Sequence, residues 1–348
     1  LKGTTVWSRE RGEVGPIWAD NAFAGEFGDN FIADTSLEGG HIPEAIRRLL
    51  DTVVKYLPQF YDTMLNGLTA SDKLAVKKSL QYLESAGDVG INLNQLNDFY
   101  IDFPGFAQKR INEVRDLQVG SMTVWPGGWS KPGGGHAIMY IVEKTSASTV
   151  SWVTCNTGDG IGHHPCTQQF YPKEKRKLAI RIDNIPVDRL ANEAFLYILF
   201  RLQAIANKSH NEGMYYQVVL PFLIGAERAL STSWNHDDPF GEWETPQKAG
   251  TCFFRCVLCT LKYLLRRQSV KNGKIKLFFH AIRQAFLLQA LEDLKDPKLM
   301  ERPIHHSQAK LVKLASTQTA YSAVKECQAG RLNSVELHKV KSLCEEVD

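Results

Sequence analysis

Two segments more than a hundred residues apart carry the residue types of a nucleophilic site. Gly134, Gly135 and His136 open an apolar run that predicts a strand, and Gln247 stands five residues before Cys252, which opens a predicted helix. A thiol in the first turn of a helix lies near unpaired backbone N–H groups and the positive end of the helix dipole, which favours the thiolate. Together these residues supply a nucleophile, a base and an oxyanion donor.

A hairpin brings a third group to the histidine. Strands predicted over residues 137–144 and 150–155 are joined by a short polar turn. Antiparallel pairing then places His136 opposite Asn156 or the residue after it, with both side chains on one face. We expect the carboxamide of Asn156 to hold the imidazole in one tautomer. Asp159 in the following turn is the alternative partner, and the register favours Asn156.

The elements that must position these groups follow from the hydrophobic pattern. Apolar residues recur at helical spacing over residues 41–115, short β-branched and aromatic runs separated by Gly, Pro and Ser fill residues 117–182, and helical spacing returns from residue 187. We therefore expect a helical lobe, a small antiparallel sheet and a second helical part. The predicted strands are 121–125, 137–142, 150–155 and 178–182, and the later helices are 190–206, 252–267, 276–294, 308–329 and 334–345.

Composition narrows the class of protein. The chain has 348 residues, 43% of them hydrophobic, and a formal net charge of only +3 with dispersed Lys and Arg, so no nucleic-acid or anionic-membrane partner is expected. The densest basic run, residues 173–177, contains an acid and is interpreted as a solvated turn rather than a phosphate site. No apolar run spans a bilayer and residues 1–20 lack a signal-peptide pattern, while seven cysteines form no secreted-type framework. We expect a cytoplasmic protein with reduced thiols.

The two motifs resemble the catalytic boxes of papain-like cysteine proteases, and of ubiquitin-specific proteases in particular. The resemblance covers the cysteine box at residues 250–261, the histidine box at 134–144, and the Trp-containing strand 151–156. It implies four roles: Cys252 as nucleophile, His136 as base, Asn156 as orienting residue and Gln247 as oxyanion donor. In that family the cysteine usually comes first along the chain. The reversed order here implies a circular permutation, since a triad is defined by geometry and not by chain order.

The resemblance implies an α+β fold with a circularly permuted papain-like core. Residues 1–115 would form a helical lobe or extension, and 116–348 a catalytic domain, with the histidine-bearing sheet in 116–185 and the nucleophile in the helical part 186–348. The implied function is deubiquitination, that is, cleavage after the Gly-Gly tail of ubiquitin or a ubiquitin-like modifier without a cofactor. The alternatives are a cysteine protease or acyltransferase for another peptide or amide, and a non-catalytic binding module with an inert Cys252.

Two further segments are interpreted as substrate contacts. The run from Trp125 to Gly135 combines flexible glycines, Gly128 among them, with a second tryptophan, Trp129, and we expect both indoles to close over an extended peptide beside His136. Four acids stand shortly before the nucleophile and are expected to contact a basic residue near the scissile bond: Asp237, Asp238, Glu242 and Glu244. The Leu-Arg-Gly-Gly tail of ubiquitin has both properties. The alternatives are tryptophans packed at a sheet corner and a solvated acidic loop.

One loop contains several metal-ligand residue types: Cys155, His163, His164 and Cys166. Adjacent histidines rarely point at one ion and no Cys-x-x-Cys element is present, so we expect no metal. The alternative is a glycine-rich rim, residues 158–165, at the mouth of the site. Cys256 and Cys259 share the predicted helix of Cys252 and are assigned to the core.

Overall fold

The computed structural model describes Phe23, Glu26, Phe27 and residues 41–167, 174–225, 234–247, 250–296 and 306–345. The chain divides into two compact units, one of Leu1–Leu37, Arg48–Gly67 and Lys276–Asp348, the other of Glu38–Arg47 and Leu68–Ile275. The described part of the first unit is helical, whereas the second contains antiparallel sheets and every candidate site residue. The α+β class expected from the sequence is therefore confirmed.

The central sheet of the second unit has four antiparallel strands in the order β1-β2-β3-β6. They are β1 (Met122–Lys131), β2 (Gly134–Lys144), β3 (Thr149–Cys155) and β6 (Ala179–Pro186). A smaller sheet joins β4 (Cys166–Thr167), β5 (Lys175–Lys177) and β7 (Trp243–Glu244). The four predicted strands and the hairpin are confirmed, and the first strand runs six residues further than predicted.

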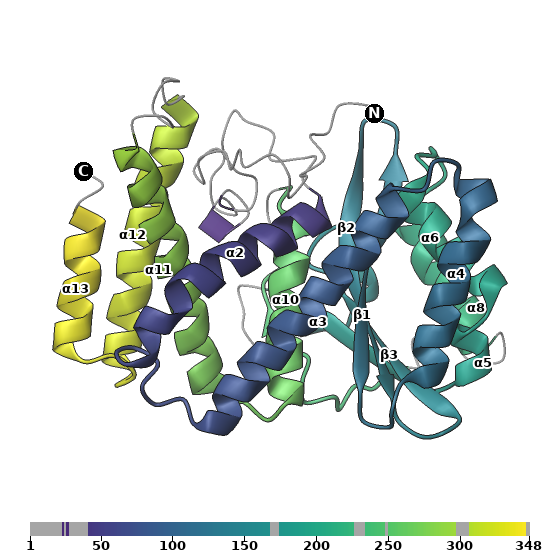
Figure 1. Ribbon diagram of the computed structural model, residues 1–348, viewed down its shortest axis with the longest axis horizontal. Coiled ribbons are helices and arrows are strands. Elements are labelled where there is room, and N and C mark those ends of the chain that lie inside the picture. Colours follow the sequence, from purple (N-terminus) through teal and green to yellow (C-terminus); the bar gives the residue numbers. More distant parts are fainter. Residues whose placement is uncertain are drawn as a thin grey trace. The chain divides into compact units, whose positions relative to one another are not determined.

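Three helices precede the sheet, in the region where the pattern predicts a helical lobe: α2 (Ile42–Tyr61), α3 (Ala70–Asn94) and α4 (Phe99–Asp116). Thr69 and Asp72 form a capping box at the start of α3, and Asp98 accepts two backbone N–H bonds at the start of α4. Figure 1 shows α3 beside α10 (Cys252–Arg267) on one face of the central sheet, and α4 beside α6 (Glu193–Ala204) on the other. Because α3 and α4 pack in the same unit as the sheet, this division differs from the expected boundary near residue 115.

The later helices include all five predicted ones, together with helical turns over residues 212–224 that were not predicted. They are α5 (Val187–Leu190), α6, α7 (Glu212–Met214), the π-helical turn η4 (Tyr215–Val219), α8 (Leu220–Ile224), α10, α11 (Asn272–Lys295), α12 (His306–Gln328) and α13 (Ser334–Glu345). Among the described helices, none has the length and apolar character required to span a bilayer.

Within the first unit, hydrogen bonds and ion pairs made by side chains join separate helices. Lys55 donates to Glu292 at 2.6 Å, and Tyr56 donates to Gln289 at 3.2 Å. Ser316 of α12 donates to the carbonyl of Cys344 in α13 at 2.9 Å. The described helices of this unit therefore have their own packing contacts, separate from the sheet.

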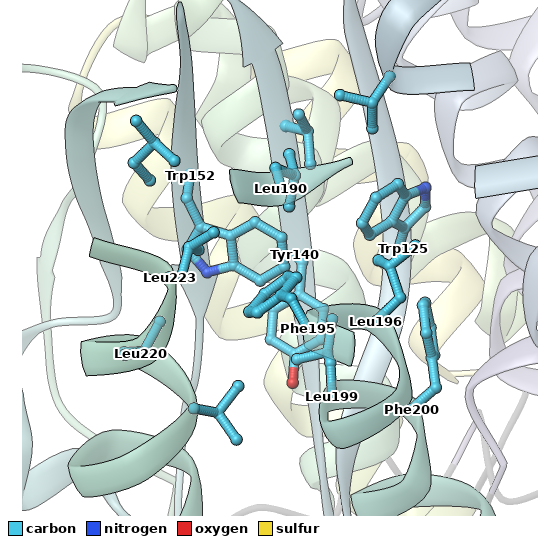
Figure 2. Close-up of a cluster of buried hydrophobic side chains, with 14 of the residues drawn as sticks. Trp125, Tyr140, Trp152, Leu190, Phe195, Leu196, Leu199, Phe200, Leu220 and Leu223 are labelled. Carbon is cyan, nitrogen blue, oxygen red and sulfur yellow. The ribbon is translucent and has the colours of Figure 1, made fainter. Parts of the chain in front are cut away.

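An aromatic layer covers one face of the central sheet (Figure 2). Trp125, Tyr140 and Trp152 come from β1, β2 and β3 and point to the same side, because side chains along a strand alternate between faces. Their rings lie close together, with 4.7 Å between the centroids of Tyr140 and Trp152. Leucine and phenylalanine side chains of α6 and α8, including Phe195 and Leu220, cover them. Burial of rings this large is a major source of stability for the sheet.

Two glycines allow β1 to lie directly against β2. A Cβ on Gly127 would stand 2.0 Å from a ring carbon of Tyr140, and a Cβ on Gly128 would stand 1.9 Å from the carbonyl oxygen of His136. Gly128 also has φ of +130°, which side chains disfavour. The glycines therefore permit the pairing that sets Trp129 opposite His136.

We expect Gly128→Ala to lower the free energy of unfolding by about 3 kcal/mol, because the new methyl meets backbone of the neighbouring strand. Gly133→Ala is the matched control, since Gly133 also has positive φ but its Cβ would meet nothing within 4 Å. Its cost is expected to be about 1 kcal/mol, from backbone strain alone. Urea denaturation measures both, and equal losses would contradict the contact argument.

Candidate active site

The nucleophile candidate lies at the start of a helix, as predicted. Cys252 is the first residue of α10, and α10 packs against β2. The thiol interacts with its own backbone N–H, with that of Phe253, and across the interface with the backbone N–H of Ala137. Within the described chain, the side chain of Thr251 makes no capping hydrogen bond, so the first N–H groups of α10 face the site. Cys252 is thus placed beside His136, the neighbour of Ala137.

His136 and Asn156 are joined by a buried hydrogen bond. Nε2 of His136 lies 2.8 Å from Oδ1 of Asn156, and both side chains are buried. The expected register is wrong by two residues, because β2 and β3 pair with Met139 opposite Cys155, which sets Asn156 beside Ile138. A shift of two residues preserves the face of the sheet, so the two side chains meet as diagonal neighbours.

The surroundings of Asn156 define the tautomer of His136. The Nδ2 group of Asn156 donates to the carbonyl of Asp159 at 2.7 Å and to the hydroxyl of Tyr216 at 3.0 Å. Its Oδ1 accepts from the backbone N–H of Gly158 at 3.0 Å and faces His136. Since Oδ1 only accepts, Nε2 of His136 carries the proton and Nδ1 keeps its lone pair. Asn156 is the partner of the imidazole, and Asp159 contributes its main-chain carbonyl.

Gln247 is oriented by Thr157, a residue that the sequence analysis did not single out. The Thr157 hydroxyl donates to Oε1 of Gln247 at 2.6 Å, and the N–H of Gln247 donates to the carbonyl of Thr157 at 2.8 Å. The amide nitrogen is therefore directed into the site, where the Gln247 side chain interacts with the thiol of Cys252. A Cβ on Gly158 would stand 2.7 Å from Nε2 of Gln247 and 2.9 Å from Cε1 of His136. The four predicted residues thus converge at one place.

Burial decides the charge state of the pair. It raises the pKa of the Cys252 thiol, although the nearby N–H groups and Gln247 act in the opposite direction. Burial also lowers the pKa of His136, with the hydrogen bond to Asn156 partly offsetting it. At neutral pH the thiol of Cys252 and the imidazole of His136 are therefore both uncharged. The thiolate expected from the helix terminus is not favoured here, because desolvation outweighs the dipole.

The expectation that two tryptophans close over a peptide from a loop is wrong. Met122–Lys131 is a strand, and Trp125 and Trp129 are 0% and 1% exposed. Trp125 belongs to the aromatic layer, whereas the ring of Trp129 packs on the imidazole of His136 with centroids 4.9 Å apart. The packing alternative therefore holds. Gly134 and Gly135, at the exposed start of β2, remain beside the site.

The expectation of four acids open to substrate is wrong for three of them. Glu244 pairs with Lys262 at 2.7 Å, Glu242 pairs with Arg266, and Asp238 is buried. Burial by itself would raise the pKa of Glu244, but the charge of Lys262 outweighs it and lowers that pKa. Asp237 alone of the four is exposed. Three of the acids therefore belong to the structure of the segment before the nucleophile.

The loop that contains His163, His164 and Cys166 is held in place by hydrogen bonds of His164. His164 is buried, with Nδ1 2.7 Å from the carbonyl of Lys177 and Nε2 2.7 Å from the hydroxyl of Tyr216. Cys155 is buried and Cys166 is exposed. Among the described residues, no three metal-ligating side chains gather.

The glycine-rich rim keeps its shape through one guanidinium. Arg176 Nη1 donates to the carbonyls of Ile161, Gly162 and His164 at 3.0 to 3.2 Å. The interpretation of residues 173–177 as a solvated turn is wrong, because Lys175–Lys177 is a strand in which the side chain of Arg176 contacts this rim and Lys177 is buried. Residue 173 lies outside the described residues. Cys256 and Cys259 are buried in α10, as assigned.

No protein-family model matches this sequence, and no curated protein matches it.

The pKa shifts predict how Cys252 reacts with a small alkylating reagent. Because burial raises the pKa of the thiol, the thiolate fraction grows only as the pH rises above the ordinary thiol pKa of about 8.5. We expect the alkylation rate of the free protein, followed by mass spectrometry with iodoacetamide, to increase through this alkaline range. A rate already at its plateau in mildly acidic solution would contradict the neutral pair.

Proposed function

We propose that this chain is a cysteine-dependent peptide or isopeptide hydrolase. The observation that carries the proposal is the buried hydrogen bond from Nε2 of His136 to Oδ1 of Asn156, made beside the thiol of Cys252 at the start of α10. It leaves Nδ1 of His136 as a base next to a nucleophile, which is the arrangement that thiol hydrolysis requires. Gln247 adds a donor directed at the same place.

The first half of the proposed reaction forms an acyl-enzyme. Nδ1 of His136 takes the proton of the Cys252 thiol as the sulfur attacks the substrate carbonyl. The developing oxyanion accepts hydrogen bonds from the backbone N–H of Cys252 and from the Gln247 amide. The imidazolium then gives its proton to the leaving amine, and the C–N bond breaks to leave a thioester.

The second half restores the enzyme. His136 takes a proton from water, the hydroxide attacks the thioester carbonyl, and the C–S bond breaks with the proton returned to sulfur. Throughout, Oδ1 of Asn156 accepts from Nε2 and stabilises the imidazolium that forms twice in the cycle. The neutral starting pair suits this scheme, because proton transfer accompanies attack.

Ubiquitin is the substrate class that we propose for this hydrolase. The resemblance of residues 250–261 and 134–144 to ubiquitin-specific protease boxes supports it. A second support is the crowding around Gly158, where even a methyl group would touch His136 and Gln247. A substrate that ends in Gly-Gly brings no side chain to such a place. The ion-paired acids Glu242 and Glu244 give no support to recognition of the arginine in the ubiquitin tail.

Ubiquitin carrying a C-terminal propargylamide warhead tests nucleophile, base and substrate class together. We expect a covalent adduct of the intact protein on a gel, none with Cys252→Ala, and a rate about 100-fold lower with His136→Ala, because the general base is lost. Cys166→Ala is the matched control, since Cys166 is an exposed thiol outside the site and its loss should change nothing.

Two other outcomes would redirect the proposal. If no adduct forms but iodoacetamide labels Cys252 in a His136-dependent manner, the hydrolase stands and ubiquitin is discarded in favour of another peptide or amide substrate, or acyl transfer. If no adduct forms and Cys252 is inert, the chain is a binding module.

Gly158→Ala should impair the reaction without unfolding the protein. The added methyl would meet His136 and Gln247, and a displacement of about 1 Å lowers the rate of a catalytic step by about 100-fold. Gly162→Ala, in the same rim, is the control because its Cβ would meet nothing within 4 Å. The rate of adduct formation and the melting temperature are compared for both, and equal rates would contradict the crowded site.

A further inference from the structure

A chain of buried hydrogen bonds continues beyond Asn156. Its Nδ2 group donates to the hydroxyl of Tyr216 at 3.0 Å, and that hydroxyl lies 2.7 Å from Nε2 of His164. Nδ1 of His164 lies 2.7 Å from the carbonyl oxygen of Lys177 in β5. Asn156 and Tyr216 are 0% exposed and His164 is 2% exposed, so solvent offers these groups no alternative partners.

The chemistry of the groups gives this chain one direction. A carbonyl oxygen only accepts, so Nδ1 of His164 carries a proton. Burial lowers the pKa of His164 to about 3, so the ring is neutral and Nε2 is an acceptor. The hydroxyl of Tyr216 therefore donates to His164, and its oxygen accepts from Nδ2 of Asn156.

A reversed carboxamide would conflict with the groups around it. Its oxygen would face the carbonyl of Asp159, and its NH₂ group would face the N–H of Gly158. The Tyr216 hydroxyl also excludes that arrangement, because its proton is donated to His164 and a reversed carboxamide would turn a second oxygen toward it. Asn156 is thus held with Oδ1 toward His136.

We infer that Tyr216 and His164 are positioning residues of the site, which fix the carboxamide of Asn156 and thereby the tautomer that leaves Nδ1 of His136 free to take the thiol proton. The inference rests on the proposed function for its catalytic meaning. The consecutive tyrosines at 215 and 216 have separate partners, because Tyr215 bonds Thr154 and the indole of Trp152. Both lie in the π-helical turn η4, a rare geometry that is frequent at functional sites.

The tyrosine pair supplies a matched experiment. Tyr216→Phe and Tyr215→Phe each remove one buried hydroxyl from the same turn, but only the first breaks the chain to Asn156. The tautomer of His136 is read from ¹⁵N NMR of histidine-labelled protein, with the signal assigned by its absence in His136→Ala. We expect the Nε2–H tautomer alone in the intact protein and in Tyr215→Phe, and a mixture of tautomers in Tyr216→Phe.

The rate of adduct formation with the ubiquitin warhead provides a second readout. We expect Tyr216→Phe to react about 10-fold more slowly than Tyr215→Phe at neutral pH, because part of the population lacks the base. Two substitutions of His164 test the other end. In His164→Gln the amide oxygen can still accept from Tyr216, whereas His164→Asn is too short to do so, and we expect only the former to retain most of the rate.

The outcomes separate this inference from the proposed function. If His136 keeps one tautomer in both Tyr216→Phe and His164→Asn, the inference is overturned even where the intact protein reacts with ubiquitin. If the tautomer responds while the intact protein ignores the warhead, the positioning role stands and the ubiquitin proposal fails. Should Tyr216→Phe fail to fold, the His164 pair decides through the same NMR signal.

Discussion

The hydrogen bond between Nε2 of His136 and Oδ1 of Asn156 is the contact on which the rest of the site depends. It is buried, and a buried donor or acceptor left unpaired costs about 1–3 kcal/mol. The groups around it are accordingly matched: Gly158 donates to the same oxygen, and the carbonyl of Asp159 and the hydroxyl of Tyr216 accept from the amide nitrogen. Complementary donors and acceptors, rather than opposite charges, hold the imidazole in place. The neutral imidazole of His136 and the carboxamide of Asn156 therefore have hydrogen-bond partners without any charged group.

The sheet contributes to this contact from both faces. On one face the aromatic layer extends to Trp129, whose ring lies on the imidazole of His136. On the other, α10 packs against β2 (Figure 1), and the thiol of Cys252 at its first residue interacts with the backbone of Ala137 near the start of that strand. The close approach of β1 at Gly128 allows the first arrangement. His136, the proposed base, therefore lies where an apolar layer ends and a helix begins, which accounts for the burial that shifts the pKa values of His136 and Cys252.

The sequence predicted those features that local pattern determines. The strands and most of the helices follow from hydrophobic periods, although the helical turns over residues 212–224 were not predicted. The convergence of Cys252, His136 and Asn156 follows from a helix start and from the alternation of faces along a hairpin, which a register error of two residues does not change. The continuation of the first strand from residue 126 to Lys131, which carries Trp129, was missed because its glycines are typical of a loop, whereas here they fit a close strand pair. Contacts between distant segments leave no local signal. The bonds that Tyr216 makes to Asn156 and His164 are of this kind, and so are the ion pairs of Glu242 with Arg266 and Glu244 with Lys262.

Those ion pairs have a consequence for the segment that carries Gln247. Glu242 and Glu244 fix the segment to α10, the backbone of Gln247 is fixed to Thr157, and α10 itself begins at Cys252. A segment held at points so close in sequence has already lost most of its conformational entropy on folding. Gln247, the proposed oxyanion donor, is therefore preorganised: its orientation is established before any substrate arrives, and the binding energy of the substrate is not needed to create it.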